Sequence, residues 1–179
     1  MSRPSAKQEV VKAALRLAAD TGLAALTFEA VAETAGKTKG GVIYHFRSKD
    51  DLVRAVVQQL IDEWDADASR HLGVPFDDAT REDRIIAFLL SCVDPGYEIT
   101  AAGDLSVLVD VMRDDRYVGI WTSLREKWIG DVSTLTITQQ IALAAADGIW
   151  VDEAMQQAPY PDGRRETIVA ELSRMVRGN

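Results

Sequence analysis

The sequence predicts an all-α protein of about nine helices, and three observations lead to this prediction. Apolar residues recur every three or four positions along most of the chain. Residues that commonly begin helices, mostly Ser and Thr, stand directly before several of these segments. No stretch of useful length alternates between apolar and polar residues as a half-buried strand would. With 179 residues, the chain can form one medium domain or a small module joined to a larger one.

The first three helices are predicted within the first 46 residues. Apolar residues at helical spacing predict a helix over about 5–20, which Gly22 is well placed to end in a left-handed cap. Thr27 is a suitable N-cap for a short helix over 28–35. The next residue, Gly36, permits the positive φ of a tight turn.

A third short helix and a long fourth one follow this turn. Thr38 can cap a helix over 39–46. Ser48, with Asp51 three residues later, resembles a capping box and begins a helix over 48–72. The apolar stripe of this long helix includes Leu52, Val56 and Leu60.

The rest of the chain predicts five more helices. Thr80 with Asp83, and Thr136 with Gln139, fit the caps of two of them. Breaks are expected at 94–98 and at 159–163, where Pro and Gly gather. The predicted helices cover about 81–93, 105–112, 116–132, 138–158 and 164–178.

Composition limits the class of protein. Apolar residues make up 47% of the chain and charged residues 27%, as in ordinary soluble globular proteins. No apolar run approaches 18 residues, and the first segment lacks the apolar core and cleavage site of a secretion signal. We therefore expect a cytoplasmic protein without a membrane partner.

The single cysteine, Cys92, lies in an apolar run and cannot form an internal disulfide. No cluster of Cys and His suggests a metal site, so neither a metal nor another cofactor is expected. A redox sensor remains an alternative. A buried inert thiol is favoured, because reactive thiols need exposure and nearby positive charge.

The most informative segment is 27–54, which outlines a helix-turn-helix. In that motif the second helix fits the major groove of DNA. Lys37, Thr38 and Lys39 crowd the start of this second helix. A helix N-terminus already attracts phosphate through its free N–H groups and its dipole, and two lysines strengthen that attraction.

The charge distribution agrees with such a DNA-binding end. Residues 1–54 hold nine Lys or Arg and six Asp or Glu, whereas the whole chain has a net charge of −8. A basic end on an acidic body is typical of proteins that place one part on nucleic acid.

Two glycines, Gly40 and Gly41, follow the lysines inside the same helix. One interpretation is that glycine costs less in a first turn than its usual penalty of about 1 kcal/mol in a helix interior. The other is that the missing side chains let the backbone approach base edges or a thymine methyl. The sequence leaves both open.

Tyr44, His45 and Lys49 gather where this helix ends and the next begins. Tyr and His can donate hydrogen bonds to phosphate oxygens, and Lys49 adds positive charge. Alternatively, Tyr44 is a half-buried aromatic of the three-helix core, and His45 is an ordinary surface residue.

With these residues in view, positions 1–54 resemble the DNA-binding head of the TetR-type transcriptional repressors. The resemblance rests on the order and spacing of Gly22, Leu26-Thr27, Val31-Ala32, Ala35-Gly36, Lys39-Gly40, Tyr44-His45-Phe46, Ser48-Lys49 and Leu52. It implies a helix-turn-helix DNA-binding domain over 1–53 and a helical ligand-binding and dimerisation domain over 54–179. It also implies a homodimer that binds a palindromic double-stranded operator.

The resemblance assigns DNA contacts residue by residue. Ile43 departs from the pattern, because many members carry a tyrosine there, so a contact at this position would be apolar. With few side chains to read bases, specificity would depend on the residues at the start of the helix and on DNA shape. The implied DNA-binding residues are Thr27, Lys37, Thr38, Lys39, Gly40, Gly41, Tyr44, His45 and Lys49.

The resemblance also implies that the last two helices of each chain pair across the dimer. Small residues on the first of them permit close helix approach, and apolar residues extend the surface. The alternative is that both helices pack only on their own core. The expected interface residues are Ile141, Ala144, Ala145, Gly148, Val151, Met155, Ile168, Leu172 and Met175.

Family members commonly release DNA when a small molecule enters the body, which implies a small hydrophobic effector. Large apolar residues at helical spacing could line its pocket, although such residues more often form ordinary core. The candidate pocket residues are Trp64, Phe88, Leu89, Cys92, Leu108, Met112, Trp121, Leu124, Trp128 and Trp150.

Two other classes of function are less well supported. An enzyme is not expected, because His45 and His71 are the only histidines and neither lies in a recognisable nucleophile or metal arrangement. A protein-interaction module would not need lysines at a helix start. The sequence therefore predicts a transcriptional regulator, most simply a repressor.

Overall fold

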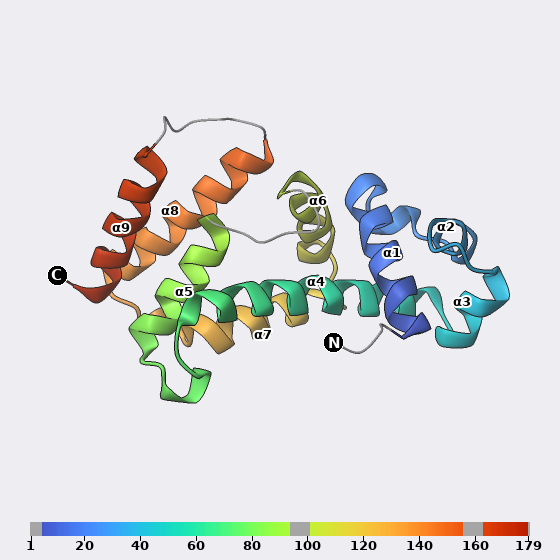
Figure 1. Cartoon of the computed structure of the whole chain (residues 1–179), viewed down its shortest axis with the longest axis horizontal. Helices are drawn as coiled ribbons and strands as arrows, with labels where there is room; N and C mark the ends of the chain where they lie inside the picture. The colour runs from blue at the N-terminus through green and yellow to red at the C-terminus, as the bar shows by residue number, and fades with distance from the viewer. Residues whose placement is uncertain (1–4, 94–100, 156–162, 179) are drawn as a thin grey trace. The chain divides into compact units, whose positions relative to one another are not determined.

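All regular structure is helical in the part of the chain that this computed structural model describes, which is residues 5–93, 101–155 and 163–178 (Figure 1). The predicted all-α fold with nine α-helices is confirmed for these residues, and three short 3-10 helices were not predicted. The breaks predicted at 94–98 and 159–163 lie outside the described residues, except for Gly163. The elements are α1 (Ala6–Thr21), η1 (Leu23–Ala25), α2 (Phe28–Thr34), α3 (Lys39–His45), α4 (Lys49–Leu72), η2 (Phe76–Asp78), α5 (Arg81–Val93), α6 (Ala101–Met112), α7 (Val118–Ile129), η3 (Val132–Thr134), α8 (Ile137–Ala154) and α9 (Arg164–Arg177).

The chain divides into two compact units. The first consists of Met1–Asp62 and Ala102–Trp121, and the second of Glu63–Ala101 and Thr122–Asn179. Helices α4 and α7 therefore each contribute residues to both units. No helix of the described residues is long and apolar enough to cross a membrane.

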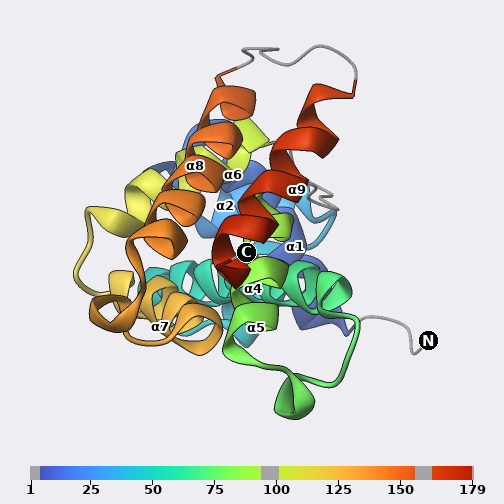
Figure 2. The ribbon, with the colours of Figure 1, turned by 90° about the vertical axis from the view of Figure 1, so that its left-hand side faces the viewer.

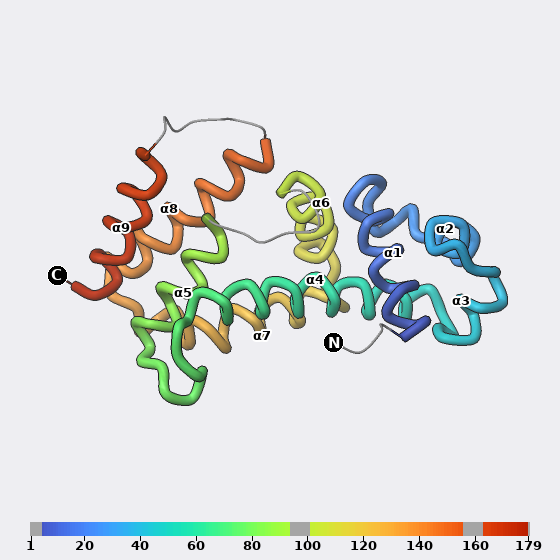
Figure 3. Tube along the Cα trace, viewed as in Figure 1, coloured from blue at the N-terminus to red at the C-terminus, as the bar shows by residue number. Residues whose placement is uncertain are grey.

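In the first unit, α1, α2 and α3 pack on one another around a small apolar core (Figure 3). The core forms because each short helix turns its few apolar side chains to the same side. Its fully or nearly fully buried members include Val10, Leu15, Leu26, Val31, Val42, Phe46 and Leu52.

Side-chain caps fix where these helices begin. Ser5 and Gln8 form a reciprocal capping box at α1. The predicted cap at Ser48 is present, since its hydroxyl accepts from the Asp51 N–H at 3.0 Å. The expectation of a left-handed cap at Gly22 was wrong, because its φ of 82° is combined with an extended ψ of 159°.

That extended ψ leads the chain into η1. A residue of α6, far away in the sequence, forms a hydrogen bond with η1. The Leu23 N–H donates to Asp110 Oδ2 of α6 at 2.8 Å. A Cβ at position 22 would lie 3.2 Å from the same oxygen. Glycine at this corner therefore serves both the positive φ and the close approach of the carboxylate.

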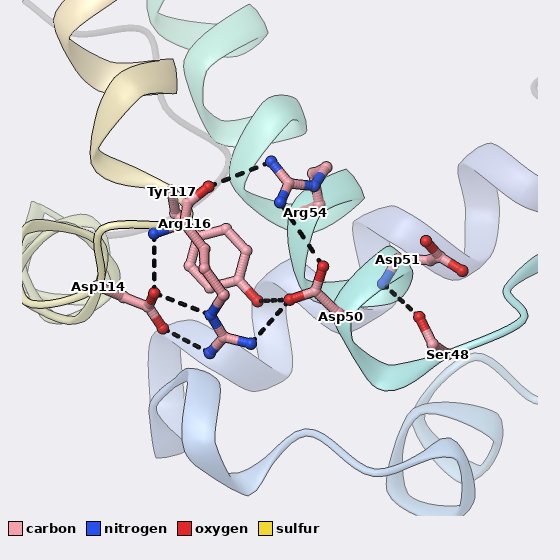
Figure 4. Close-up of polar contacts among 7 residues, drawn as sticks. All are labelled: Ser48, Asp50, Asp51, Arg54, Asp114, Arg116 and Tyr117. Carbon is pink, nitrogen blue, oxygen red and sulfur yellow. Dashed lines mark hydrogen bonds and ion pairs between the residues drawn. The ribbon is translucent and has the colours of Figure 1, made fainter.

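A polar cluster joins the α6–α7 turn to the start of α4 within the first unit (Figure 4). Asp50 Oδ1 accepts from the Tyr117 hydroxyl at 2.7 Å and from Arg116 Nη1 at 2.9 Å. Arg54 Nη1 donates to the Arg116 carbonyl at 3.2 Å, and Asp114 pairs with the Arg116 guanidinium. These bonds lower the pKa of Asp50, and desolvation together with the bond to Asp50 raises the pKa of Tyr117 to about 12.

In the second unit, α5 packs against both α8 and α9, which also contact each other (Figure 2). Its buried face includes Ile85, Phe88 and Leu89. The predicted caps are present, with Thr80 and Asp83 bonded reciprocally at α5 and Thr136 and Gln139 forming a capping box at α8. These two caps begin α5 and α8 within one residue of the predicted starts at 81 and 138.

Candidate nucleic-acid interface

A tight turn joins α2 to α3 and sets the helix-turn-helix geometry. Gly36 has a φ of 61°, which side-chain-bearing residues rarely adopt. The Lys37 N–H donates to the Ala32 carbonyl at 2.9 Å and the Gly36 N–H to the Glu33 carbonyl at 3.1 Å. These bonds satisfy carbonyls at the end of α2 and turn the chain directly into α3.

Two threonines cap the helices that frame this surface. Thr27 Oγ1 accepts from the Ala30 N–H, and Thr38 Oγ1 accepts from the Gly41 N–H, both at 3.1 Å. Each hydroxyl keeps its own proton for donation to a phosphate oxygen. Thr27 and Thr38 can therefore each cap a helix and, at the same time, contact a nucleic-acid backbone.

The two lysines at the start of α3 are paired with carboxylates of the same unit. Lys37 Nζ lies 2.8 Å from Glu9 Oε2 of α1, and Lys39 pairs with Glu29 of α2. The hydrogen bond from Lys39 lowers the pKa of Glu29, so that carboxylate is charged at neutral pH. Sequence reasoning missed both pairings, because Glu9 and Glu29 come close to the lysines only once the three helices pack.

Aromatic and apolar side chains project from the last turn of α3. Tyr44 is 85% exposed, so it is not a member of the core, and Ile43 is 43% exposed. The rings of Tyr44 and His45 lie edge to face with centroids 5.2 Å apart. Next in the chain, Phe46 is buried and anchors the end of α3.

Lys49 begins α4 and donates from Nζ to the Ala24 carbonyl at 2.7 Å. Its ammonium group has three protons, so this bond leaves donors for a phosphate. The bond also ties the start of α4 to η1, which holds Lys49 beside the turn that follows α3.

The two glycines of α3 differ in their surroundings. A Cβ built on Gly40 meets nothing within 4 Å, whereas one on Gly41 would lie 3.3 Å from Thr38 Oγ1. Neither glycine has a positive φ. Packing within the protein therefore does not explain the absence of a side chain at Gly40.

The candidate pocket residues are divided between the two units. Leu108, Met112 and Trp121 belong to the first unit, where Met112 is exposed and the other two are partly buried. In the second unit Trp64, Phe88, Leu89, Leu124, Trp128 and Trp150 are all buried.

Two of the second-unit residues have specific surroundings. Trp128 is fully buried, and its Nε1–H donates to Asp65 at 2.8 Å, which is the arrangement of a core residue. Cys92 is partly exposed as a residue, but desolvation of its thiol raises its pKa to about 12. The thiol is therefore protonated at neutral pH, as an unreactive cysteine would be.

The candidate interface residues lie mainly on one exposed face of α8. Ile141 is 51% and Met155 is 55% exposed, and Ala144 and Gly148 are exposed between them. Ala145 and Val151 border this face and are partly buried. On α9, Ile168 and Met175 are partly buried, while Leu172 is buried against its own unit.

Ile137 was missed by sequence reasoning and is the most exposed apolar residue of this face, at 76%. Its position four residues before Ile141 was the available signal. Among the described residues, no group of three or more His, Cys, Asp or Glu side chains could hold a metal ion.

Comparison with known proteins identifies the family that this chain matches. Residues 10–56 match the family model described as bacterial regulatory proteins, tetR family. Residues 82–177 match the tetracyclin repressor-like C-terminal domain. Together the two matches cover both the helix-turn-helix and most of the body.

Individual relatives agree with these matches. A 62-residue stretch is 34% identical to the HTH-type transcriptional repressor KstR2 of Mycolicibacterium smegmatis, covering 34% of this chain and 30% of the relative's length. A solved TetR-family member from Streptomyces coelicolor A3 shares 20% identity over 96% of this chain and 98% of its own, with a TM-score of 0.64.

The multidrug binding protein EbrR, solved with malachite green, shares 20% identity over 96% of this chain and 98% of its own, with a TM-score of 0.66. At such identities the structural likeness shows the fold. The members of this family are transcriptional regulators and not enzymes, in agreement with the sequence prediction. The chain belongs to the TetR family of bacterial transcriptional regulators.

Proposed function

We propose that this protein is a homodimeric repressor that binds a palindromic operator and leaves it when a small hydrophobic molecule binds the body. The observation that carries the DNA-binding part is the exposed side of α3. There two lysines crowd the helix N-terminus, and Tyr44 extends into solvent from the last turn. Helix dipole, lysines and hydroxyl donors together fit a phosphate backbone on both sides of a major groove.

Within this proposal the residues have separate roles. Thr27, Tyr44, His45 and Lys49 hold phosphates, while the start of α3 faces the bases. Gly40 and Gly41 add no side chains to that surface of α3, so the helix backbone can approach base edges closely. Few side chains then read bases directly, and DNA shape contributes to specificity.

Dimerisation is supported by the exposed apolar face of α8. Ile137, Ile141, Ala144 and Gly148 fall within an arc of about 60° when residues advance by about 100° along a helix. An exposed apolar stripe of this extent is typical of a surface that another chain covers. A two-fold pair of such faces would present two α3 helices to two half-sites.

Release by an effector is supported by the aromatic residues of the second unit. Trp64 and Trp150 meet edge to face with centroids 5.9 Å apart in its interior. The structural relative EbrR is a multidrug binding protein, and its crystal structure contains malachite green. We propose a ligand site for a lipophilic compound in the second unit of this chain.

Selection of bound sequences from random duplex DNA tests the DNA-binding part of the proposal. The recovered site should be palindromic, with half-sites about one helical turn apart. Fluorescence anisotropy against this site should show affinity that falls steeply as salt rises, because lysines displace counterions. Recovery of no sequence, or affinity that does not respond to salt, would contradict the proposal.

A further inference from the structure

Trp150 presents a buried indole N–H with no acceptor. The residue is 9% exposed, and its Nε1 is one of two buried side-chain N or O atoms without a hydrogen-bond partner in the described part of the chain. Native proteins rarely leave such a donor unpaired, and a persistent exception calls for an explanation, such as an unseen ligand or water. Another indole donor of the same unit is satisfied, since Trp128 Nε1 lies 2.8 Å from Asp65.

An aromatic ring borders Trp150. The ring of Trp64, from α4, meets that of Trp150 at 85° with centroids 5.9 Å apart. Trp150 Nε1–H is therefore a polar group set beside an apolar ring. An apolar molecule bearing one acceptor atom matches this combination of donor and ring.

A cation lies on the same side of the unit. Asp147 precedes Trp150 by three residues, so both project from one face of α8. Arg125 Nη1 of α7 contacts Asp147 Oδ2 at a long 3.4 Å, and its guanidinium lies 5.6 Å from the Phe88 ring centroid. Burial raises the pKa of Asp147, while the charge of Arg125 and its hydrogen bond to Asp147 lower it.

We propose that Trp150 Nε1–H is the hydrogen-bond anchor for the effector, which is a lipophilic molecule with an acceptor oxygen, either a carbonyl or a carboxylate. This inference depends on the proposed effector site in the body. It adds the chemical class of the compound and the atom that recognises it. The aromatic rings take the apolar part, and Arg125 assists when the oxygen belongs to a carboxylate.

Three compounds that share one tricyclic ring system test the acceptor requirement: fluorene, which has no oxygen, 9-fluorenone, which has a neutral carbonyl, and fluorene-9-carboxylate, which has an anionic carboxylate. Calorimetric titration of the full-length protein should give affinities about fivefold or more higher for at least one oxygenated compound than for fluorene, the gain typical of one hydrogen bond. Comparison of the two oxygenated compounds distinguishes a carbonyl ligand from an anionic one.

Nuclear magnetic resonance identifies the atom. The chain has four tryptophans, so ¹⁵N labelling gives four indole N–H signals, and Trp150→Phe identifies the one from Trp150. The preferred oxygenated compound should move that signal downfield more than the other three, and fluorene should not. The preference over fluorene should disappear in Trp150→Phe, with thermal melting used to verify that the variant is folded.

Three results would overturn the inference. The first two are equal affinity for all three compounds and binding of none of them. The third is an unmoved Trp150 signal in the wild-type protein, which is expected if a water accepts from the indole N–H. The wild-type spectra decide the matter even if Trp150→Phe does not fold. Operator affinity is measured separately. If a compound moves the Trp150 signal but leaves operator affinity unchanged, this ligand site stands and the proposed release from DNA is contradicted. If a compound releases the protein from DNA but leaves the Trp150 signal unmoved, the proposed release stands and this ligand site is contradicted.

Discussion

Glu29 occupies an unusual place for a carboxylate, since it pairs with a lysine at the start of the proposed recognition helix. Both side chains are more than half exposed, so the pair itself adds little to stability. In the proposed complex with DNA, Glu29 would compete with phosphate for Lys39 and repel the DNA backbone. We therefore expect this residue to limit operator affinity.

We predict that Glu29→Gln raises operator affinity by about threefold to tenfold, since it removes one negative charge close to the phosphates. The slope of log affinity against log salt should steepen by up to about one unit, as Lys39 then neutralises a phosphate fully. Anisotropy titrations over a range of salt concentrations measure both quantities.

Glu33→Gln is the matched control, because it makes the same charge change on an exposed residue of the same helix. Its effect should be clearly smaller. In a Lys39→Met background, the gain from Glu29→Gln should shrink. Equal gains from both glutamine variants would instead indicate a general effect of net charge.

The residue scale also explains what the sequence could and could not predict at the site. Lys37, Thr38, Lys39 and Tyr44 became candidates because helix caps, glycine turns and charge spacing are local signals. Their pairing partners were not, because Lys37 and Glu9 are 28 positions apart and meet only through helix packing. Sequence alone therefore singled out candidate groups for the proposed DNA-facing surface and missed the carboxylates that pair with its lysines.

At the scale of elements, the same distinction separates predicted from unpredicted features of the fold. Ser48, Thr80 and Thr136 begin helices through contacts three residues away, which a sequence displays directly. The short helix η1 depends on Asp110, which is 87 positions from Leu23, and was not predicted. Long-range side-chain support of this kind has no local signature.

Gly40 provides a prediction about helix α3, because the two interpretations of this glycine predict different operator affinities for Gly40→Ala. We predict that Gly40→Ala leaves thermal stability equal or slightly higher, since the new Cβ meets nothing within 4 Å and alanine favours a helix. Operator affinity should nevertheless fall by about tenfold or more, because the methyl group holds the helix backbone away from the bases.

Gly119→Ala is a close control for this change. Gly119 is the second residue of α7, as Gly40 is of α3, it is exposed, and its added Cβ also meets nothing within 4 Å. It should affect stability similarly and leave operator affinity unchanged. Wild-type affinity in Gly40→Ala would favour the other interpretation, in which the glycine is merely tolerated in a first turn.

At the scale of the whole molecule, operator binding by the proposed mechanism requires two copies of the chain. One head contacts a single half-site, and joining two heads makes the second contact effectively intramolecular, which raises affinity by orders of magnitude. The exposed face of α8 is where we expect the copies to meet. Ile141 lies on this face one turn after Ile137 and is 51% exposed.

We predict that Ile141→Glu converts the protein from a dimer to a monomer, because it would bury an unpaired carboxylate twice, once in each copy across a two-fold interface. Sedimentation velocity at micromolar concentration measures the change. Val74→Glu is the control, since Val74 is 49% exposed, close to the 51% of Ile141, and lies outside α8 and α9.

The monomeric variant should keep its helical circular dichroism and its binding to a single half-site. Its affinity for the full operator should fall to about that half-site value, whereas Val74→Glu should bind the operator as wild type does. A dimer that persists in Ile141→Glu would place the contact between copies elsewhere on the chain. A monomer that still binds the full operator tightly would show that the α8 face is not what joins the two heads on DNA.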